Sequence, residues 1–139
     1  MKTVAEIAEE VAMIGPRIGR KLMSDMANVA DIPQAQLFVI MRLFHHGACR
    51  LFDICHEMKV SAPTATGIVT RLEKSGYVKR RVDKDDRRAV VVELTPQGHK
   101  VALELRGVVV KRWTEILAGL SRDDAEKYLE ILKKISEAI

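Results

Sequence analysis

The spacing of apolar residues changes at Gly76, and this change limits the folds that the chain can adopt. Before Gly76 and after Thr95, apolar residues recur every three or four positions, which is the period of an α-helix. Between these regions lie two short runs, 77–82 and 89–94, that are rich in β-branched residues and flank the polar segment 83–88. The pattern predicts a mainly α chain (α+β) with one small β-hairpin that has a charged tip.

Residues that start, stop or interrupt helices divide the helical regions. The apolar stripe over residues 4–28 is interrupted at Gly15-Pro16. We expect a kink or a break into two helices there, because proline has no backbone N–H and crowds the preceding turn. Glycines at 47 and 76 are expected to end the helices before them. The other helices are expected over residues 33–46, about 53–59, 61–75, 95 or 96 to about 120, and from 121 to the end.

The helix expected over 61–75 has two contrasting faces. Its apolar residues at 65, 68, 69 and 72 follow helical spacing and should face the core. The opposite face carries short or hydroxyl-bearing side chains, which allow a helix to approach the edges of DNA bases. The alternative is an ordinary amphipathic helix with solvated threonines. The candidate DNA-binding residues of this segment are Ser61, Pro63, Thr64, Thr66, Gly67, Thr70 and Arg71.

Positive charge is concentrated beside this helix. The segment from Arg71 to Arg88 holds eight basic and four acidic residues, which equals the net charge of +4 of the whole chain. Such a local surplus favours a polyanionic partner, although a solvated charged hairpin has the same pattern. Helix, turn, helix and basic hairpin is the order of a winged helix-turn-helix, in which the second helix enters the DNA major groove.

Several classes of protein are disfavoured. No window approaches eighteen uninterrupted apolar residues, and Glu6 comes too early for a secretion signal, so we expect a cytoplasmic protein that does not enter membranes. The sequence has no glycine-rich phosphate loop, no Ser-His-Asp order and no metal-ligand cluster, so we expect no enzyme activity, no cofactor and no metal site. Adjacent His45 and His46 would point about 100° apart on a helix, which does not suit one metal ion.

Four motifs lie in the centre of the chain: Ser61-x-x-Thr64, Arg71-Leu72-Glu73-Lys74-x-Gly76-Tyr77-Val78-x-Arg80, Asp86-Arg87-Arg88 and Val92-x-Leu94-Thr95-x-x-Gly98. The most specific part is an Asp-x-Arg that is followed six residues later by Leu-Thr-x-x-Gly. Together these motifs resemble the MarR family of bacterial and archaeal transcription regulators, and the resemblance extends over essentially the whole chain.

The resemblance implies a homodimer in which the first and last helices intertwine, with two winged modules on a pseudo-palindromic operator in double-stranded DNA. It implies that Arg88 inserts into the minor groove and that Asp86 orients it. We add Arg80 and Arg87 of the hairpin to the DNA-binding candidates. Where the family often has a capping serine or threonine before the helix at about 53–59, this chain has Phe52 followed by Asp53, so the cap can shift by one residue.

We therefore expect one domain over residues 1–139, with a winged helix-turn-helix core at 33–100 and dimerisation helices at 1–30 and 101–139. The long terminal apolar stripes support a dimer independently, because a module of about seventy residues cannot cover them.

The predicted function is sequence-specific DNA binding by a transcription regulator, a repressor released by a small aromatic or anionic effector. Arg17 and His46 are candidates for contact with such an anion, although the sequence does not locate its pocket. The alternatives are a winged-helix adaptor that binds an acidic protein, or a regulator that senses oxidants through Cys49 or Cys55, or metals through its histidines.

Overall fold

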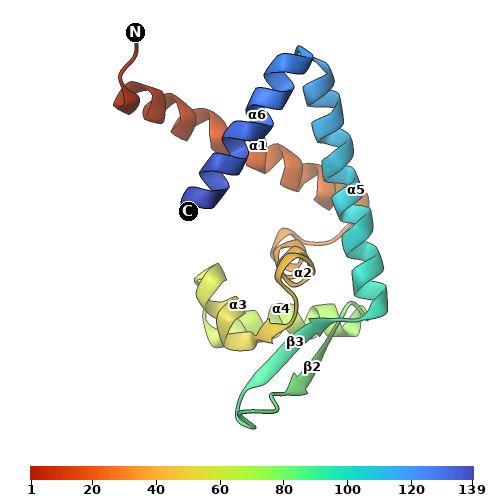
Figure 1. Ribbon diagram of the computed structural model, residues 1–139. Coiled ribbons are helices and arrows are strands. Elements are labelled where there is room, and N and C mark those ends of the chain that lie inside the picture. Colours follow the sequence, from red (N-terminus) through yellow and green to blue (C-terminus); the bar gives the residue numbers. More distant parts are fainter.

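The computed structural model describes residues 1–139 and confirms a mainly helical chain with a small antiparallel sheet. In Figure 1, α1 and α6 lie at one end, the β2–β3 hairpin lies at the other, and α5 runs between them. The helices are α1 (Val4–Ala30), α2 (Gln34–His46), α3 (Leu51–Met58), α4 (Ala62–Lys74), α5 (Pro96–Ala118) and α6 (Arg122–Ala138). The strands are β1 (Cys49–Arg50), β2 (Val78–Val82) and β3 (Val90–Leu94).

The first helix is continuous, so the break into two helices expected at Gly15-Pro16 is wrong. A proline inside a helix removes one backbone hydrogen bond and crowds one turn, and the many hydrogen bonds on either side of it keep a 27-residue helix intact. Thr3 and Glu6 form a reciprocal capping box at its start: Thr3 Oγ1 accepts the Glu6 N–H at 3.2 Å, and the Glu6 carboxylate accepts the Thr3 N–H at 2.7 Å.

The sheet has three strands in the order β1-β3-β2, one more than the predicted hairpin. β2 and β3 pair antiparallel with Arg80 opposite Val92, and β1 pairs with β3 with Cys49 opposite Val92. A strand of two residues is too short to show alternation in a sequence, which explains why the pattern did not reveal β1.

The helix after β1 begins earlier than expected, at Leu51 rather than near Asp53. Arg50 is its N-cap residue, and the Asp53 carboxylate accepts the backbone N–H of Arg50 at 3.2 Å. The acidic side chain therefore lies in the first turn, where it complements the helix dipole, and does not precede the helix.

The core is formed by α2, α3, α4, α5 and the sheet, with α1 contributing its C-terminal end. All four residues predicted for the inner face of α4 are buried, namely Ala65, Ile68, Val69 and Leu72. On α2, Leu37, Val39, Ile40 and Leu43 are buried, and Met41 and Phe44 are partly buried.

The Leu-Thr-x-x-Gly motif joins the start of α5 to the turn between α4 and β2. Thr95 Oγ1 accepts the Gly98 N–H at 3.0 Å and donates to the Gly76 carbonyl oxygen at 2.5 Å. The backbone N–H of Thr95 donates to the Tyr77 carbonyl oxygen at 3.1 Å. A Cβ at position 98 would lie 1.9 Å from that same oxygen, so only glycine fits this joint.

The two terminal helices contribute little to the core of one chain. Met26 is the only buried residue of α1, and α6 has none. Their apolar stripes are exposed, including Val11 and Ile14 on α1 and Leu129 and Ile135 on α6. None of the helices has the length and hydropathy of a membrane span.

Candidate nucleic-acid interface

The outer face of α4 is uncharged from its N-cap to Thr70. Ser61 caps the helix, with its Oγ accepting the Thr64 N–H at 3.3 Å and donating to Thr64 Oγ1 at 2.9 Å. Pro63 and Thr64 are exposed, and Thr66 and Gly67 are half-buried. Nothing lies within 4 Å of the position that a Cβ would occupy at Gly67, so another molecule can approach the backbone closely there.

Arg80 of β2 and Thr70 of α4, both predicted to bind DNA, contact each other. The Arg80 Nη2 donates to Thr70 Oγ1 at 3.3 Å and to Glu73 Oε1 at 2.9 Å. The hydrogen bond from Arg80 holds the pKa of Glu73 below its usual range. This group therefore fixes the position of the hairpin relative to α4. Sequence reasoning had assigned no role to Glu73.

The turn at the hairpin tip is organised by two aspartates. Asp86 Oδ1 accepts the backbone N–H of Arg88 at 3.0 Å and lies 3.4 Å from Arg88 Nε. The Arg88 side chain is 94% exposed, so Asp86 fixes its base while its guanidinium projects into solvent. That Asp86 orients Arg88 toward DNA stays a prediction.

The second aspartate, Asp83, connects the tip to the rest of the sheet. Its Oδ1 accepts the Asp85 N–H at 3.0 Å, and its Oδ2 accepts from Arg50 Nε of β1 at 2.8 Å. The backbone N–H of Asp85, together with Arg50, lowers the pKa of Asp83. Arg50 was missed by the sequence analysis, because its partner lies 33 positions away on a strand pairing that the pattern did not show.

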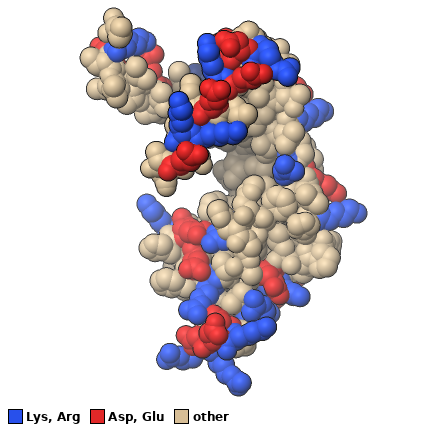
Figure 2. Space-filling model, viewed as in Figure 1, with Lys and Arg blue, Asp and Glu red and all other residues tan.

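The acidic side chains of this region are mostly engaged within the molecule. Glu73, Asp83 and Asp86 are bonded as described, and Glu93 lies within 4 Å of Lys79 and Arg81. Figure 2 shows Lys and Arg side chains gathered around the hairpin, with acidic side chains among them. Four cations make no ion pair and remain for an external anion: Arg71, Lys74, Lys84 and Arg87.

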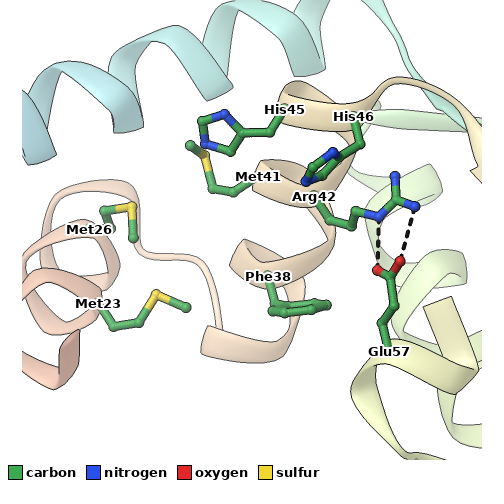
Figure 3. Close-up of a pocket in the computed structure, with 8 residues that line it drawn as sticks. All are labelled: Met23, Met26, Phe38, Met41, Arg42, His45, His46 and Glu57. Atoms are coloured by element: carbon green, nitrogen blue, oxygen red, sulfur yellow. Dashed lines mark hydrogen bonds and ion pairs between the residues drawn. The ribbon is translucent and has the colours of Figure 1, made fainter. Parts of the chain in front are cut away.

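A cavity of about 390 Å³ lies between α1, α2 and α3 (Figure 3). One part of its wall is apolar, with three methionines and a phenylalanine, and the other part is polar. Arg42 of α2 binds Glu57 of α3 through two hydrogen bonds, Nε to Oε2 at 2.8 Å and Nη2 to Oε1 at 3.0 Å. His46 lines this cavity as well, whereas Arg17 is exposed on α1 and does not. The lining residues are Met23, Met26, Phe38, Met41, Arg42, His45, His46 and Glu57.

The two cysteines are free and differ in exposure. Cys49 is buried in β1, and Cys55 is half-buried in α3. Burial raises the pKa of the Cys49 thiol, which lowers the fraction of reactive thiolate. No group of three or more His, Cys, Asp or Glu side chains is placed to hold a metal ion.

Comparisons with known proteins agree on one family. The model of the MarR family matches residues 32–90. The chain is 36% identical over 110 residues to the uncharacterized HTH-type transcriptional regulator YfiV of Bacillus subtilis, covering 77% of this chain and 69% of that protein. It is 33% identical to the HTH-type transcriptional regulator FarR of Neisseria gonorrhoeae, covering 81% of this chain and 79% of that protein. Among solved structures, NadR in complex with 4-hydroxyphenylacetate superposes with a TM-score of 0.69 at 28% identity, covering 90% of this chain and 89% of that one.

Proposed function

Because the chain belongs to the MarR family of winged-helix transcription regulators, we propose that it is a homodimeric repressor whose affinity for its operator falls when a small aromatic or anionic effector binds. In this proposal the protein acts by binding DNA and an effector, and it catalyses no reaction. One observation carries the DNA-binding part of the proposal: an uncharged helix face lies beside a hairpin in which most acidic groups bind other groups of the protein and the tip arginine is exposed.

In this proposal α4 enters the major groove and the hairpin tip reaches the adjacent minor groove. The outer residues of α4, together with Arg87 and Arg88, touch the DNA. Thr70, Arg80 and Asp86 hold those residues in position, because their polar atoms bond to other groups of the same module. Arg71 makes no ion pair, and its position at the edge of the helix suits a phosphate contact.

The dimer is supported by the exposed apolar faces of α1 and α6. Val11 and Ile14 are 61% and 53% exposed, and Leu129 and Ile135 are 52% and 50% exposed. Two helices with such faces and almost no buried residues are stabilised when a second copy covers them. Two-fold symmetry then presents two α4 helices to a pseudo-palindromic operator.

The effector site is inferred to be the cavity between α1, α2 and α3. Its volume of about 390 Å³ lies in the range of small-molecule sites, and its apolar wall with a few convergent polar groups is typical of them. The NadR complex with 4-hydroxyphenylacetate supports an aromatic acid as the class of effector.

The test is a fluorescence-anisotropy titration of the protein with duplexes from the DNA upstream of its own gene, alongside shuffled duplexes of equal composition. We expect the dissociation constant to be lower for one native duplex than for its shuffled version by about a thousandfold or more. The variant Thr66→Glu places a negative charge on the outer face of α4 and should abolish this binding. Thr114→Glu adds the same charge on α5 and is the matched control.

An adaptor that grips an acidic protein through its hairpin would give a different result. Its affinity for DNA would not depend on sequence, and Thr66→Glu would leave binding of its partner unchanged. Either equal affinity for native and shuffled duplexes, or full DNA binding by Thr66→Glu, contradicts the proposed function.

A further inference from the structure

The cavity between α1, α2 and α3 combines the two features that recognise an apolar carboxylate. Met23, Met41 and Phe38 offer thioether and ring surfaces to an apolar body. Arg42 offers a planar guanidinium, the group best suited to bind a carboxylate through two hydrogen bonds. Figure 3 shows Arg42 and Glu57 together at one end of the cavity and the methionines toward the other end.

The guanidinium already holds a carboxylate, that of Glu57. The two hydrogen bonds are 2.8 and 3.0 Å long, and they use Nε and Nη2, one complete edge of the guanidinium. The Arg42 side chain is only 16% exposed. A carboxylate from solution that binds this edge must therefore displace Glu57, because two carboxylates cannot occupy the same pair of donors.

The Arg42–Glu57 pair is also the hydrogen-bonded connection between α2 and α3. Arg42 lies in the middle of α2, whose buried residues belong to the core, and Glu57 lies in the last turn of α3. α3 packs directly on α4, the helix proposed to enter the major groove. Loss of the ion pair therefore removes the hydrogen-bonded attachment to α2 of the helix that supports the DNA-reading one.

We propose that Glu57 is an internal competitor for the effector: an aromatic or other apolar carboxylate enters the cavity, replaces the Glu57 carboxylate on Arg42, and thereby releases α3 from α2. This inference rests on the proposed function, which supplies the role of α4 and the class of effector, and adds the contact through which the effector acts. Binding of the carboxylate and binding of DNA then oppose each other through one ion pair, and each lowers the affinity for the other by the same factor.

The experiment measures binding of 4-hydroxyphenylacetate, benzoate and the neutral amide 4-hydroxyphenylacetamide by isothermal titration calorimetry. The proteins are the wild type, Glu57→Gln, Arg42→Gln and the control Glu126→Gln. The control also removes a carboxylate that is paired with an arginine, Arg122, at the far end of the molecule on α6. Circular dichroism melting curves establish that each variant is folded.

Removing the competitor should strengthen carboxylate binding. We expect Glu57→Gln to bind at least one of the two carboxylates about tenfold more tightly than the wild type and to bind the amide unchanged. Arg42→Gln should lose the preference for the acid over its amide, and Glu126→Gln should behave as the wild type. The proposal is overturned if Glu57→Gln binds the carboxylates no better than the wild type, or if neither protein binds them at millimolar concentration.

The coupling to DNA is measured separately, by repeating the DNA titration with and without 4-hydroxyphenylacetate. The ligand should weaken DNA binding by the wild type and have a smaller effect on Glu57→Gln, in which the ion pair is already broken. If the ligand-free wild type does not bind DNA, the proposed function is contradicted. The replacement of Glu57 by the ligand carboxylate on Arg42 is tested separately, by the ligand affinities.

Discussion

Replacing Gly98 with alanine tests the joint between α5 and the α4–β2 turn. The added Cβ would lie 1.9 Å from the Tyr77 carbonyl oxygen, 2.8 Å from the carbonyl carbon and 3.1 Å from a methyl group of Leu94. Backbone atoms cannot rotate away as a flexible side chain can. The start of α5 and the turn must therefore separate by about 1 Å, in a part of the core that is closely packed.

The cost can be worked from the bonds at the joint. Separation breaks the hydrogen bond from the Thr95 N–H to the Tyr77 oxygen, at 3.1 Å, and the one from Thr95 Oγ1 to the Gly76 oxygen. Two such bonds contribute about 2 kcal/mol, and the remaining overpacking adds about 1 kcal/mol or more. We expect the free energy of unfolding to fall by about 3 kcal/mol and Tm by about 10 °C.

The assay is urea denaturation followed by circular dichroism, at one protein concentration because dimerisation contributes to stability. Gly107→Ala is the matched control: it lies on the same helix, and nothing lies within 4 Å of its added Cβ. The control should be as stable as the wild type or more stable by up to about 1 kcal/mol, because alanine favours the helix. Equal stability of Gly98→Ala and Gly107→Ala would refute the reasoning.

Three further variants test other features of the structure. Thr95→Ala removes the N-cap of α5 and the hydrogen bond from Thr95 Oγ1 to the Gly76 oxygen, and should lower the free energy of unfolding by about 2 kcal/mol, with Thr95→Ser restoring it; denaturation curves that leave Thr95→Ala unchanged would contradict this role. Pro16→Ala should raise Tm, because it restores a backbone hydrogen bond inside a continuous helix, whereas a lower Tm would show that α1 depends on the proline. The hydrogen bond from Arg112 lowers the pKa of Asp25, and Lys21 lowers it further. The ionised carboxylate therefore stabilises the fold above about pH 4, and this stabilisation is lost as the pH falls through the lowered pKa. Asp25→Asn should therefore lose less stability than the wild type between pH 7 and pH 3, and parallel pH curves would exclude the pair as a source of acid sensitivity.

The parts of the fold that were predictable from the sequence are those with local causes. The inner face of α4 follows from helical spacing, its start from the Ser61 cap, and the hairpin from two β-branched runs. Of the two outcomes predicted at Pro16, a kink or a break, the break was wrong, because a local rule was applied where the rest of the helix decides the outcome.

The contacts that shape the candidate site depend on the tertiary structure. Arg50 and Asp83 are 33 positions apart, and Arg42 and Glu57 lie on different helices 15 positions apart, so no spacing rule connects them. The motif residues Thr95 and Gly98 were visible in the sequence. The reason for the glycine, a carbonyl oxygen of Tyr77 that would lie 1.9 Å from an added Cβ, required the structure.

The salt dependence of DNA binding by Arg88→Ala tests most directly whether the hairpin tip contacts the duplex beside α4. Arg122→Ala is the control, because that side chain is 90% exposed and also pairs with a nearby carboxylate, but lies at the start of α6. The slope of log K against log salt should become shallower by about one charge for each hairpin of the dimer in Arg88→Ala, with weaker binding, and should be unchanged in Arg122→Ala. Equal slopes and affinities for Arg88→Ala and the wild type would contradict the account.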